Sequence, residues 1–426
     1  MHVQKTTNNP TEVTLTITAS PEDLEPIKQQ ILKKLSKDVK IPGFRGGKVP
    51  MQLVEKNVDP VTFQTEFLDE AMTQLYARAT EAEQIRPVTQ PKVDVKKFVP
   101  FTTLEYDVTT NVIGPIKVGK YKGLKSSVKD KTVTAEDVKK VLETLQTRLS
   151  ERKSVDRAAK ADDEVIMDFK GVDAKGDPIN GADGKEYPLT LGSNAFIPGF
   201  EDNLISMKPG EEKSFTLTFP KDYGVKALAS KKVTFTVTIK TVNELSKPEL
   251  NDTFASTTGP FKTLQELKDD IKKQLEHEAG HEVLRDRQNE LLAQVVDASE
   301  VAIPQALVDQ QSVYELDELR RNLTYRGQTF QEFIEAEATT EEEYKKDVIE
   351  PRALNQVKTG VILAEIAEVE KLEVTPEELE AQMQALKVQY KDPAMQAELE
   401  KPETRRDIAS RILSQKVVNL IVETSI

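Results

Sequence analysis

The chain has 426 residues, of which 38% are hydrophobic and 31% are charged, and its formal net charge is −13. This balance favours about three folded domains over a disordered chain, and the negative charge argues against a general nucleic-acid-binding protein, so no DNA partner is expected. The sequence has no apolar run near the roughly 18 residues that span a bilayer and no signal-peptide core in its first twenty residues, which predicts a cytoplasmic protein without membrane contact. It has no Cys, so disulfides and thiol chemistry are not expected.

The first part of the chain has the pattern of a small α+β domain. Residues 12–18 alternate apolar residues with threonine, which predicts a half-buried strand. Ser20 and Pro21 then favour a helix start, because Ser caps free backbone N–H groups and Pro suits the first helical position. A second helix is expected from Asp59-Pro60, and strands are expected near residues 88–95 and 103–108.

A loop rich in Gly and Pro, residues 41–50, separates the two helices. Seven Lys or Arg residues stand against one acidic residue, Asp38, between Lys28 and Lys48, so this segment is strongly basic in an acidic chain. One interpretation is a solvated helix face followed by an ordinary glycine turn. The other is a docking loop for an anionic partner, in which Arg45 and Lys48 meet phosphate or carboxylate groups.

The loop sequence GFRGGKVP resembles the ribosome-docking signature of the trigger factor family of bacterial chaperones, Gly-Phe-Arg-x-Gly-Lys-x-Pro. The matching positions are Gly43, Phe44, Arg45, Gly47, Lys48 and Pro50. The resemblance implies that these residues bind the ribosome near the nascent-chain exit. It therefore favours the docking interpretation.

The middle of the chain predicts a helix that begins after Thr134, a charged connector to about Asp163, and then an antiparallel β domain. Within that domain stand VIMDFKG, YPLTLG, FIPGFEDN, GEEKSFTLTFPKDYG and VTFTVTIKTV, in this order. The set resembles the FKBP-type peptidyl-prolyl isomerase family. The resemblance implies a proline pocket lined by Phe169, Ile179, Tyr187, Leu189, Phe196, Ile197, Phe200, Tyr223 and Phe235.

The chain departs from the isomerase family at Ile179-Asn180, where an aromatic residue followed by Asp is usual. An apolar pocket would speed X–Pro rotation by desolvation and shape, without an acid, a base, a nucleophile or a cofactor. One alternative is that the aromatic residues form only the core of a β domain. Another is a holdase whose FKBP-like domain binds peptides without catalysis.

Composition changes after Lys247, where Pro and Gly become scarce and long helices are expected. Capping boxes are predicted at Thr263–Glu266, Thr340–Glu343 and Thr375–Glu378. Two apolar stripes at helical spacing follow, formed by Leu264, Leu267, Ile271 and Leu275 and by Leu379, Met383, Leu386 and Tyr390. Such stripes fit a helix–helix core, and they also fit aliphatic patches of an open cradle, which the trigger factor resemblance implies for this region.

The sequence HEAGH, residues 277–281, matches the H-E-x-x-H pattern of zinc metalloproteases. The same helix face carries Asp270, Lys273 and Gln274, so it is expected to be solvated, and Gly280 weakens the helix. Two exposed histidines are therefore favoured over a metal centre, and neither a metal nor a cofactor is expected.

The sequence as a whole predicts an α+β multidomain protein in which an FKBP-like antiparallel β domain is inserted into a mostly α-helical chaperone domain. The expected parts are a ribosome-binding α+β domain at 1–113, a linker and helix at 114–149, the isomerase domain at 150–245 and a helical substrate-binding domain at 246–426. The resemblance implies a ribosome-associated chaperone that holds nascent and unfolded polypeptides, isomerises X–Pro bonds and assists folding, export and cell division. A free isomerase unrelated to ribosomes is disfavoured by the docking motif, and a homodimer off the ribosome is left open.

Overall fold

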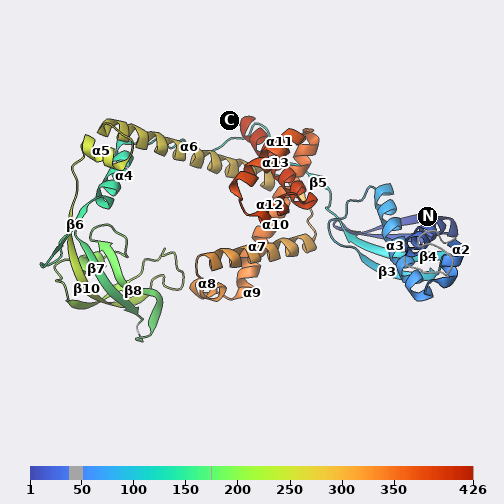
Figure 1. Cartoon of the computed structure of the whole chain (residues 1–426), viewed down its shortest axis with the longest axis horizontal. Coiled ribbons are helices and arrows are strands. Elements are labelled where there is room, and N and C mark those ends of the chain that lie inside the picture. The colour runs from blue at the N-terminus through green and yellow to red at the C-terminus, as the bar shows by residue number, and fades with distance from the viewer. Residues whose placement is uncertain (38–50, 174, 426) are drawn as a thin grey trace. The chain divides into compact units, whose positions relative to one another are not determined.

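The computed structural model describes residues 1–37, 51–173 and 175–425 (Figure 1). Contacts divide the chain into two units, one formed by residues 1–126, 290–319 and 345–426 and the other by residues 127–289 and 320–344. Antiparallel sheets lie in the first and middle parts of the sequence and helices dominate after residue 250, which confirms the α+β multidomain prediction. Among the described residues, no helix has the length and apolar character that a membrane crossing requires.

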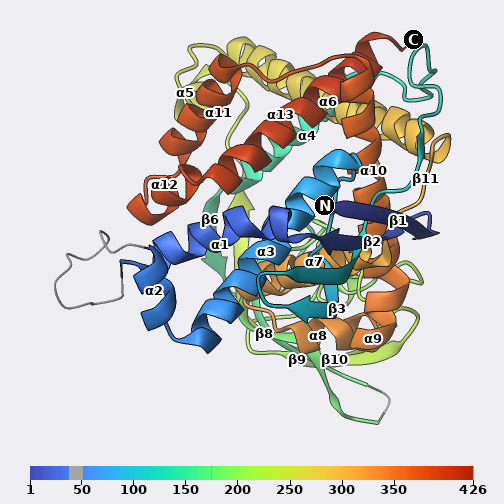
Figure 2. The ribbon, with the colours of Figure 1, turned by 90° about the vertical axis from the view of Figure 1, so that its right-hand side faces the viewer.

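A four-stranded antiparallel sheet begins the first unit, in the order β1-β2-β4-β3. Its strands are β1 (His2–Asn9), β2 (Glu12–Ala19), β3 (Lys92–Val99) and β4 (Thr103–Asn111), and its helices are α1 (Pro21–Leu35), α2 (Met51–Asn57) and α3 (Pro60–Ala82). The alternation in β2 buries Leu15 and Ile17, which pack with Phe67 and Leu75 of α3 in one core. Figure 2 shows α1 and α3 beside this sheet.

The two predicted helix starts are confirmed by their caps. The backbone N–H of Ser20 donates to the Asp23 carboxylate at 2.9 Å, and the N–H of Thr62 donates to Asp59 at 2.8 Å. Pro21 and Pro60 occupy the first helical positions, where the missing N–H costs no hydrogen bond. The side-chain caps expected from the sequence are therefore present where both helices begin.

Several elements differ from the sequence predictions, and α2 and β8 are among those that were not expected. The strand expected at 88–95 begins only at Lys92, because Pro91 cannot donate a ladder hydrogen bond. The charged connector before Asp163 contains a strand, β6 (Glu151–Val155), which pairs with a longer strand. β1 was not predicted at all. Both β1 and β6 are mostly exposed edge strands, so neither has the alternation of apolar residues that predicts a strand.

The second unit is built on a five-stranded antiparallel sheet in the order β6-β10-β7-β8, with β9 also paired to β10. Its other strands are β7 (Glu164–Val172), β8 (Pro178–Thr190), β9 (Glu212–Thr218) and β10 (Lys232–Ser246), and a short 3₁₀ turn, η1 (Glu201–Asn203), crosses one side. The predicted strands at 165–169, 215–219 and 233–239 lie in β7, at β9 and in β10. Their inward side chains form one core that includes Val165, Met167, Phe200, Val237 and Ile239.

Three helices of the second unit surround a separate small core. They are α4 (Ala135–Arg148), α5 (Asp252–Thr258) and the first part of α6 (Leu264–Asp297). Leu267 and Ile271, from the first predicted stripe, are buried against Val138 and Leu142 of α4. This stripe is therefore helix–helix core.

The remaining elements are a two-stranded pair and a set of helices. They are β5 (Ile116–Lys117), β11 (Glu300–Val301), α7 (Gln305–Tyr325), α8 (Phe330–Ala336), α9 (Glu341–Tyr344), the π-helix η2 (Lys345–Ile349), α10 (Glu350–Val369), α11 (Pro376–Gln389), α12 (Pro393–Leu399) and α13 (Pro402–Glu423). Met383 of the second stripe is buried between α11, α12 and α13, whereas Tyr390 at its end is exposed. This stripe is thus partly core.

Two of the three predicted capping boxes are complete. At α11 the N–H of Thr375 donates to Glu378 at 2.9 Å, and the N–H of Glu378 donates to the Thr375 hydroxyl at 3.3 Å. The box at Thr340–Glu343 is closed in the same way. At α6, however, the Glu266 carboxylate accepts the N–H of Lys262 instead.

Candidate functional site

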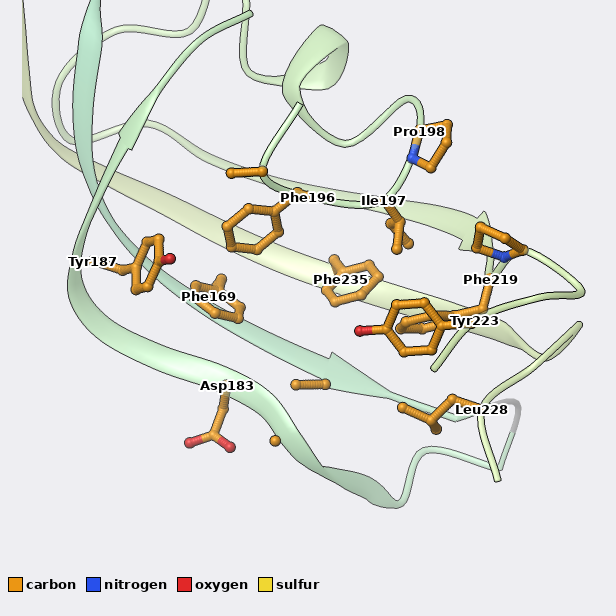
Figure 3. Close-up of a pocket in the computed structure, with 14 residues that line it drawn as sticks. Phe169, Asp183, Tyr187, Phe196, Ile197, Pro198, Phe219, Tyr223, Leu228 and Phe235 are labelled. Carbon is orange, nitrogen blue, oxygen red and sulfur yellow. The ribbon is translucent and has the colours of Figure 1, made fainter. Parts of the chain in front are cut away.

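A cavity of about 540 Å³ opens on the middle sheet. Its walls come from β7, β8, β10 and two loops, residues 195–198 and 219–228 (Figure 3). The lining residues are Phe169, Gly181, Ala182, Asp183, Tyr187, Ala195, Phe196, Ile197, Pro198, Phe219, Pro220, Tyr223, Leu228 and Phe235. The cavity is therefore mainly aromatic and aliphatic, with an exposed carboxylate, Asp183, at its edge.

The aromatic rings form an edge-to-face network. Phe169 lies 5.3 Å from Phe196 and 5.9 Å from Tyr187, ring centre to ring centre, with nearly perpendicular planes. Figure 3 shows Phe235 between these rings on one side and Tyr223 with Leu228 on the other. Edge-to-face pairs are the favoured aromatic geometry, so the walls hold one another in place around an open apolar slot.

Two glycines make room for the rings. A Cβ at Gly184 would lie 2.6 Å from the Phe169 ring, and one at Gly171 would lie 3.1 Å from the Phe235 ring and 2.8 Å from the Ala182 Cβ. All three distances to neighbouring carbon atoms fall short of the roughly 3.5 Å of ordinary carbon–carbon contact. A side chain at either position would displace the floor of the cavity.

A buried carboxylate, Glu201, holds the loop that carries Phe196 and Ile197. Its oxygens accept the backbone N–H groups of Gly192 at 2.6 Å and Ala195 at 2.9 Å. Longer contacts come from the backbone N–H groups of Asn194 and Phe196 and from the Ser193 hydroxyl. Because one carboxylate satisfies several loop donors, Glu201 fixes the loop over the cavity.

An irregularity in β8 presents Tyr187 to the cavity. The register changes between the pairs Met167–Tyr187 and Phe169–Gly184, so extra residues of β8 bulge opposite Asp168. The Asp168 carboxylate accepts the N–H of Glu186 at 2.8 Å, and this bond, helped by Lys240, holds the pKa of Asp168 below its usual value. The bulge and its carboxylate together orient the Tyr187 ring toward Phe169.

The structure brings together most of the residues expected at the pocket. Six of them line the cavity: Phe169, Tyr187, Phe196, Ile197, Tyr223 and Phe235. Phe200 has 0% exposed surface and stacks beneath Phe196 at 4.3 Å, and Leu189 is also buried in the core. Ile179 is partly buried and packs against the same core, outside the lining set.

Sequence reasoning missed several lining residues, among them Phe219, Leu228 and Asp183. Phe219 and Leu228 reach the cavity because the chain turns back there, with the N–H of Phe219 donating to the carbonyl of Lys231 at 3.0 Å. The adjacent motif GEEKSFTLTFPKDYG contains Phe219, so it could have been included. The residue pattern around Leu228 does not predict that its side chain lines the cavity.

The six residues of the docking motif, Gly43, Phe44, Arg45, Gly47, Lys48 and Pro50, lie outside the described residues. His277 and His281 lie on α6 and are both exposed. Among the residues that the structure describes, no group of three or more His, Cys, Asp or Glu side chains is arranged to hold a metal ion.

Three family models match the chain. The model described as bacterial trigger factor protein matches residues 1–145, that of FKBP-type peptidyl-prolyl cis-trans isomerase matches residues 155–240, and that of the bacterial trigger factor C-terminus matches residues 263–423. The chain is also similar along its length to curated relatives. The trigger factor of Carboxydothermus hydrogenoformans is 34% identical over 426 residues, which is 100% of this chain and 99% of the relative.

The trigger factor of Halothermothrix orenii is 31% identical over 433 residues, covering 99% of both chains. A solved structure, published as "Promiscuous Substrate Recognition in Folding and Assembly Activities of the Trigger Factor Chaperone", aligns over 99% of both chains, at 19% identity and a TM-score of 0.48.

Proposed function

This chain belongs to the trigger factor family, and we propose that it is a ribosome-associated chaperone that holds nascent and unfolded polypeptides and isomerises their X–Pro bonds. The observation that carries the enzymatic part is the cavity of about 540 Å³ walled by aromatic rings, within a segment that matches the FKBP-type family. The same family membership supports roles in protein folding and export.

The cavity suits a reaction in which no bond between heavy atoms is broken. Rotation about a peptide bond faces a barrier of about 18–20 kcal/mol, because the planar amide loses resonance as it twists. Water stabilises the planar, more polar ground state better than the twisted state. A largely apolar slot between Phe235 and Tyr223 therefore favours the twisted amide, because a bound proline ring displaces water from it.

Substitution of Tyr223 in the full-length chain tests the enzymatic part. We expect Tyr223→Ala to lower kcat/KM for a short X–Pro peptide by about tenfold or more, because it removes one wall of the slot. Tyr325→Ala is the matched control, since Tyr325 is 95% exposed on α7 and lies outside the cavity. Unchanged activity in a folded Tyr223→Ala variant would place the reaction elsewhere.

Absence of isomerisation by the parent chain, with retained peptide binding at the cavity, would establish the alternative of a holdase whose FKBP-like domain only binds peptides. Ile179, where the sequence departs from the family, is not among the residues that line the cavity. Its position is relevant to the choice between an isomerase and a peptide-binding holdase, because Ile179 packs in the core outside the cavity lining.

We propose ribosome docking from the motif residues Phe44, Arg45 and Lys48. The triple Ala variant should lose co-sedimentation with ribosomes, and salt should weaken the parent complex, because cations on the loop would release counterions from RNA. The matched control also removes two positive charges, but from the preceding helix and its end. It carries Lys33→Ala and Lys37→Ala, and both of these lysines are exposed. If the control abolishes binding and the loop variant does not, the basic helix face is the docking site.

The chaperone part is supported by apolar side chains that are exposed on the C-terminal helices. They include Val313, Tyr314, Tyr325, Leu354, Val369, Val388, Tyr390 and Met395. Single exposed apolar side chains are normal on protein surfaces, but a series of them, on helices with few aromatic residues, offers many weak contacts for an unfolded chain. Abundant charge around them keeps the free protein soluble.

A further inference from the structure

The histidine pair of α6 has no part in the proposed function. His277 and His281 are four residues apart, so they project from adjacent turns on one helix face. A hydrogen bond joins their Nε2 atoms at 3.0 Å, and their rings are perpendicular with centres separated by 4.3 Å. Both side chains are exposed, so a metal ion that displaces the shared proton reaches the two nitrogens from solution.

The separation of the two nitrogens has the size of a chelate bite. Two imidazole nitrogens bound at about 2.0–2.1 Å lie about 2.8–3.0 Å apart when they meet the metal at a right angle, and about 3.3–3.4 Å apart at a tetrahedral angle. The hydrogen-bonded pair has a separation of 3.0 Å, which is also the separation that the right-angled arrangement requires, so a metal replaces the shared proton with little movement of the rings. Square-planar and tetragonal sites with nitrogen and oxygen ligands are those of Cu²⁺ and Ni²⁺.

We propose that His277 and His281 form an open two-nitrogen site for a divalent transition metal of tetragonal preference, with Cu²⁺ bound most tightly. Water fills the remaining coordination positions. A two-residue ligand set exchanges its metal readily, so this site differs from a resident zinc centre.

The surroundings explain why the site stays open. Glu278 follows His277 directly and precedes His281 by three residues, yet no group of three His, Cys, Asp or Glu among the described residues is arranged to hold a metal ion. Glu282 is already engaged, because the Lys131 ammonium lies 2.7 Å from its carboxylate. Without a third ligand the pair lacks the metal centre of the H-E-x-x-H enzymes, in which the Glu serves as general base rather than as a ligand.

Charge on the same face sets a limit to the affinity. Lys273 precedes His277 by four residues and Arg285 follows His281 by four residues, so a cation flanks each end of the pair. Their repulsion lowers the affinity of the pair for a divalent ion. There is open space beside the pair, because a Cβ at Gly280 would meet nothing within 4 Å. A bound ion would link two helical turns and stabilise the folded state of α6 by mass action.

The test uses the full-length, tag-free chain, which contains three histidines and no Cys. All measurements are made in a His2→Ala background, because a histidine next to an amino terminus binds Cu²⁺ by itself. Calorimetric titration with CuCl₂ should show one site, and its electron paramagnetic resonance spectrum should show two imidazole nitrogens. His277→Ala and His281→Ala should each lower Cu²⁺ affinity by about tenfold or more, with unchanged helix content.

Lys273→Ala serves as a matched variant that keeps both ligands. It should raise the Cu²⁺ affinity, because it removes a flanking positive charge. Equal affinities in the parent and in both folded histidine variants would overturn the proposal, as would a spectrum with a single nitrogen ligand. Isomerase activity is not used as a readout, so the outcome is independent of the proposed function.

Discussion

In the FKBP-type domain, the aromatic side chains converge on one cavity, where Phe169, Phe196 and Phe235 pack edge to face. In the C-terminal helices, small aliphatic cores such as Ile362, Ile366 and Val417 hold the helices together, while other apolar side chains remain exposed. On the proposed function, the first arrangement concentrates binding at one point and the second spreads it over many weak contacts. The two regions should therefore respond very differently to substitution.

The largest expected effect comes from separating the two regions. Ser246 at the end of β10 pairs with Glu151 at the start of β6, so the two ends of the inserted domain are neighbours in one sheet. Removal of residues 150–245 with Leu149 joined to Ser246 should therefore leave the helices folded. We expect this deletion variant to suppress aggregation of a denatured client and to lose X–Pro isomerisation.

The isolated domain should show the converse behaviour, with isomerisation of short peptides and weak suppression of aggregation. Light scattering of a diluted, denatured client at equal molar concentrations measures the first property, and a peptide assay measures the second. Suppression by the isolated domain alone, with none from the folded deletion variant, would assign client holding to the β domain.

A second prediction separates the cavity wall from the core beneath it. Phe200 is fully buried, so Phe200→Ala should lower the free energy of unfolding by about 3–5 kcal/mol. Phe196, which stacks on it and lines the cavity, is half-buried, so Phe196→Ala should cost less stability and reduce kcat/KM more directly. Urea unfolding and peptide kinetics on both variants provide the comparison. Equal losses of stability would mean that the wall and the core are one unit.

A third, smaller effect is expected at Glu201. Glu201→Gln replaces a double acceptor by a group with one acceptor and two donors, which faces the N–H groups of Gly192 and Ala195. We expect a loss of about 2 kcal/mol in unfolding free energy and a rise in KM, because the loop with Phe196 loses its anchor. The amide NMR signals of Gly192 and Ala195 should shift. Unmoved signals with a raised KM would argue against loop anchoring.

The sequence predicted the elements whose stability is local. β2 was predicted from its alternation, and α3 and α11 from their caps. β1 and β6 could not be predicted, because their backbone hydrogen bonds depend on partners elsewhere in the chain and their side chains are mostly solvated. The ring residues of the cavity followed from a family resemblance, whereas Leu228 depends on the path of a loop. Burial of Phe200 beneath Phe196 depends on packing that residue order does not specify.

The smallest expected effect is at a single exposed residue of the helices. Val313 is 55% exposed on α7, so Val313→Ser should change the unfolding free energy by only about 0.5 kcal/mol or less. Client holding through many weak contacts should fall slightly with this change and further when Tyr314→Ser and Val388→Ser are added. The matched control is Val61→Ser on α3, where the side chain is 73% exposed. Light scattering with the series should show graded losses that add, because distant contacts act independently. A complete loss from Val313→Ser alone would instead reveal a concentrated site on the helices, and the contrast with the aromatic cavity would then disappear.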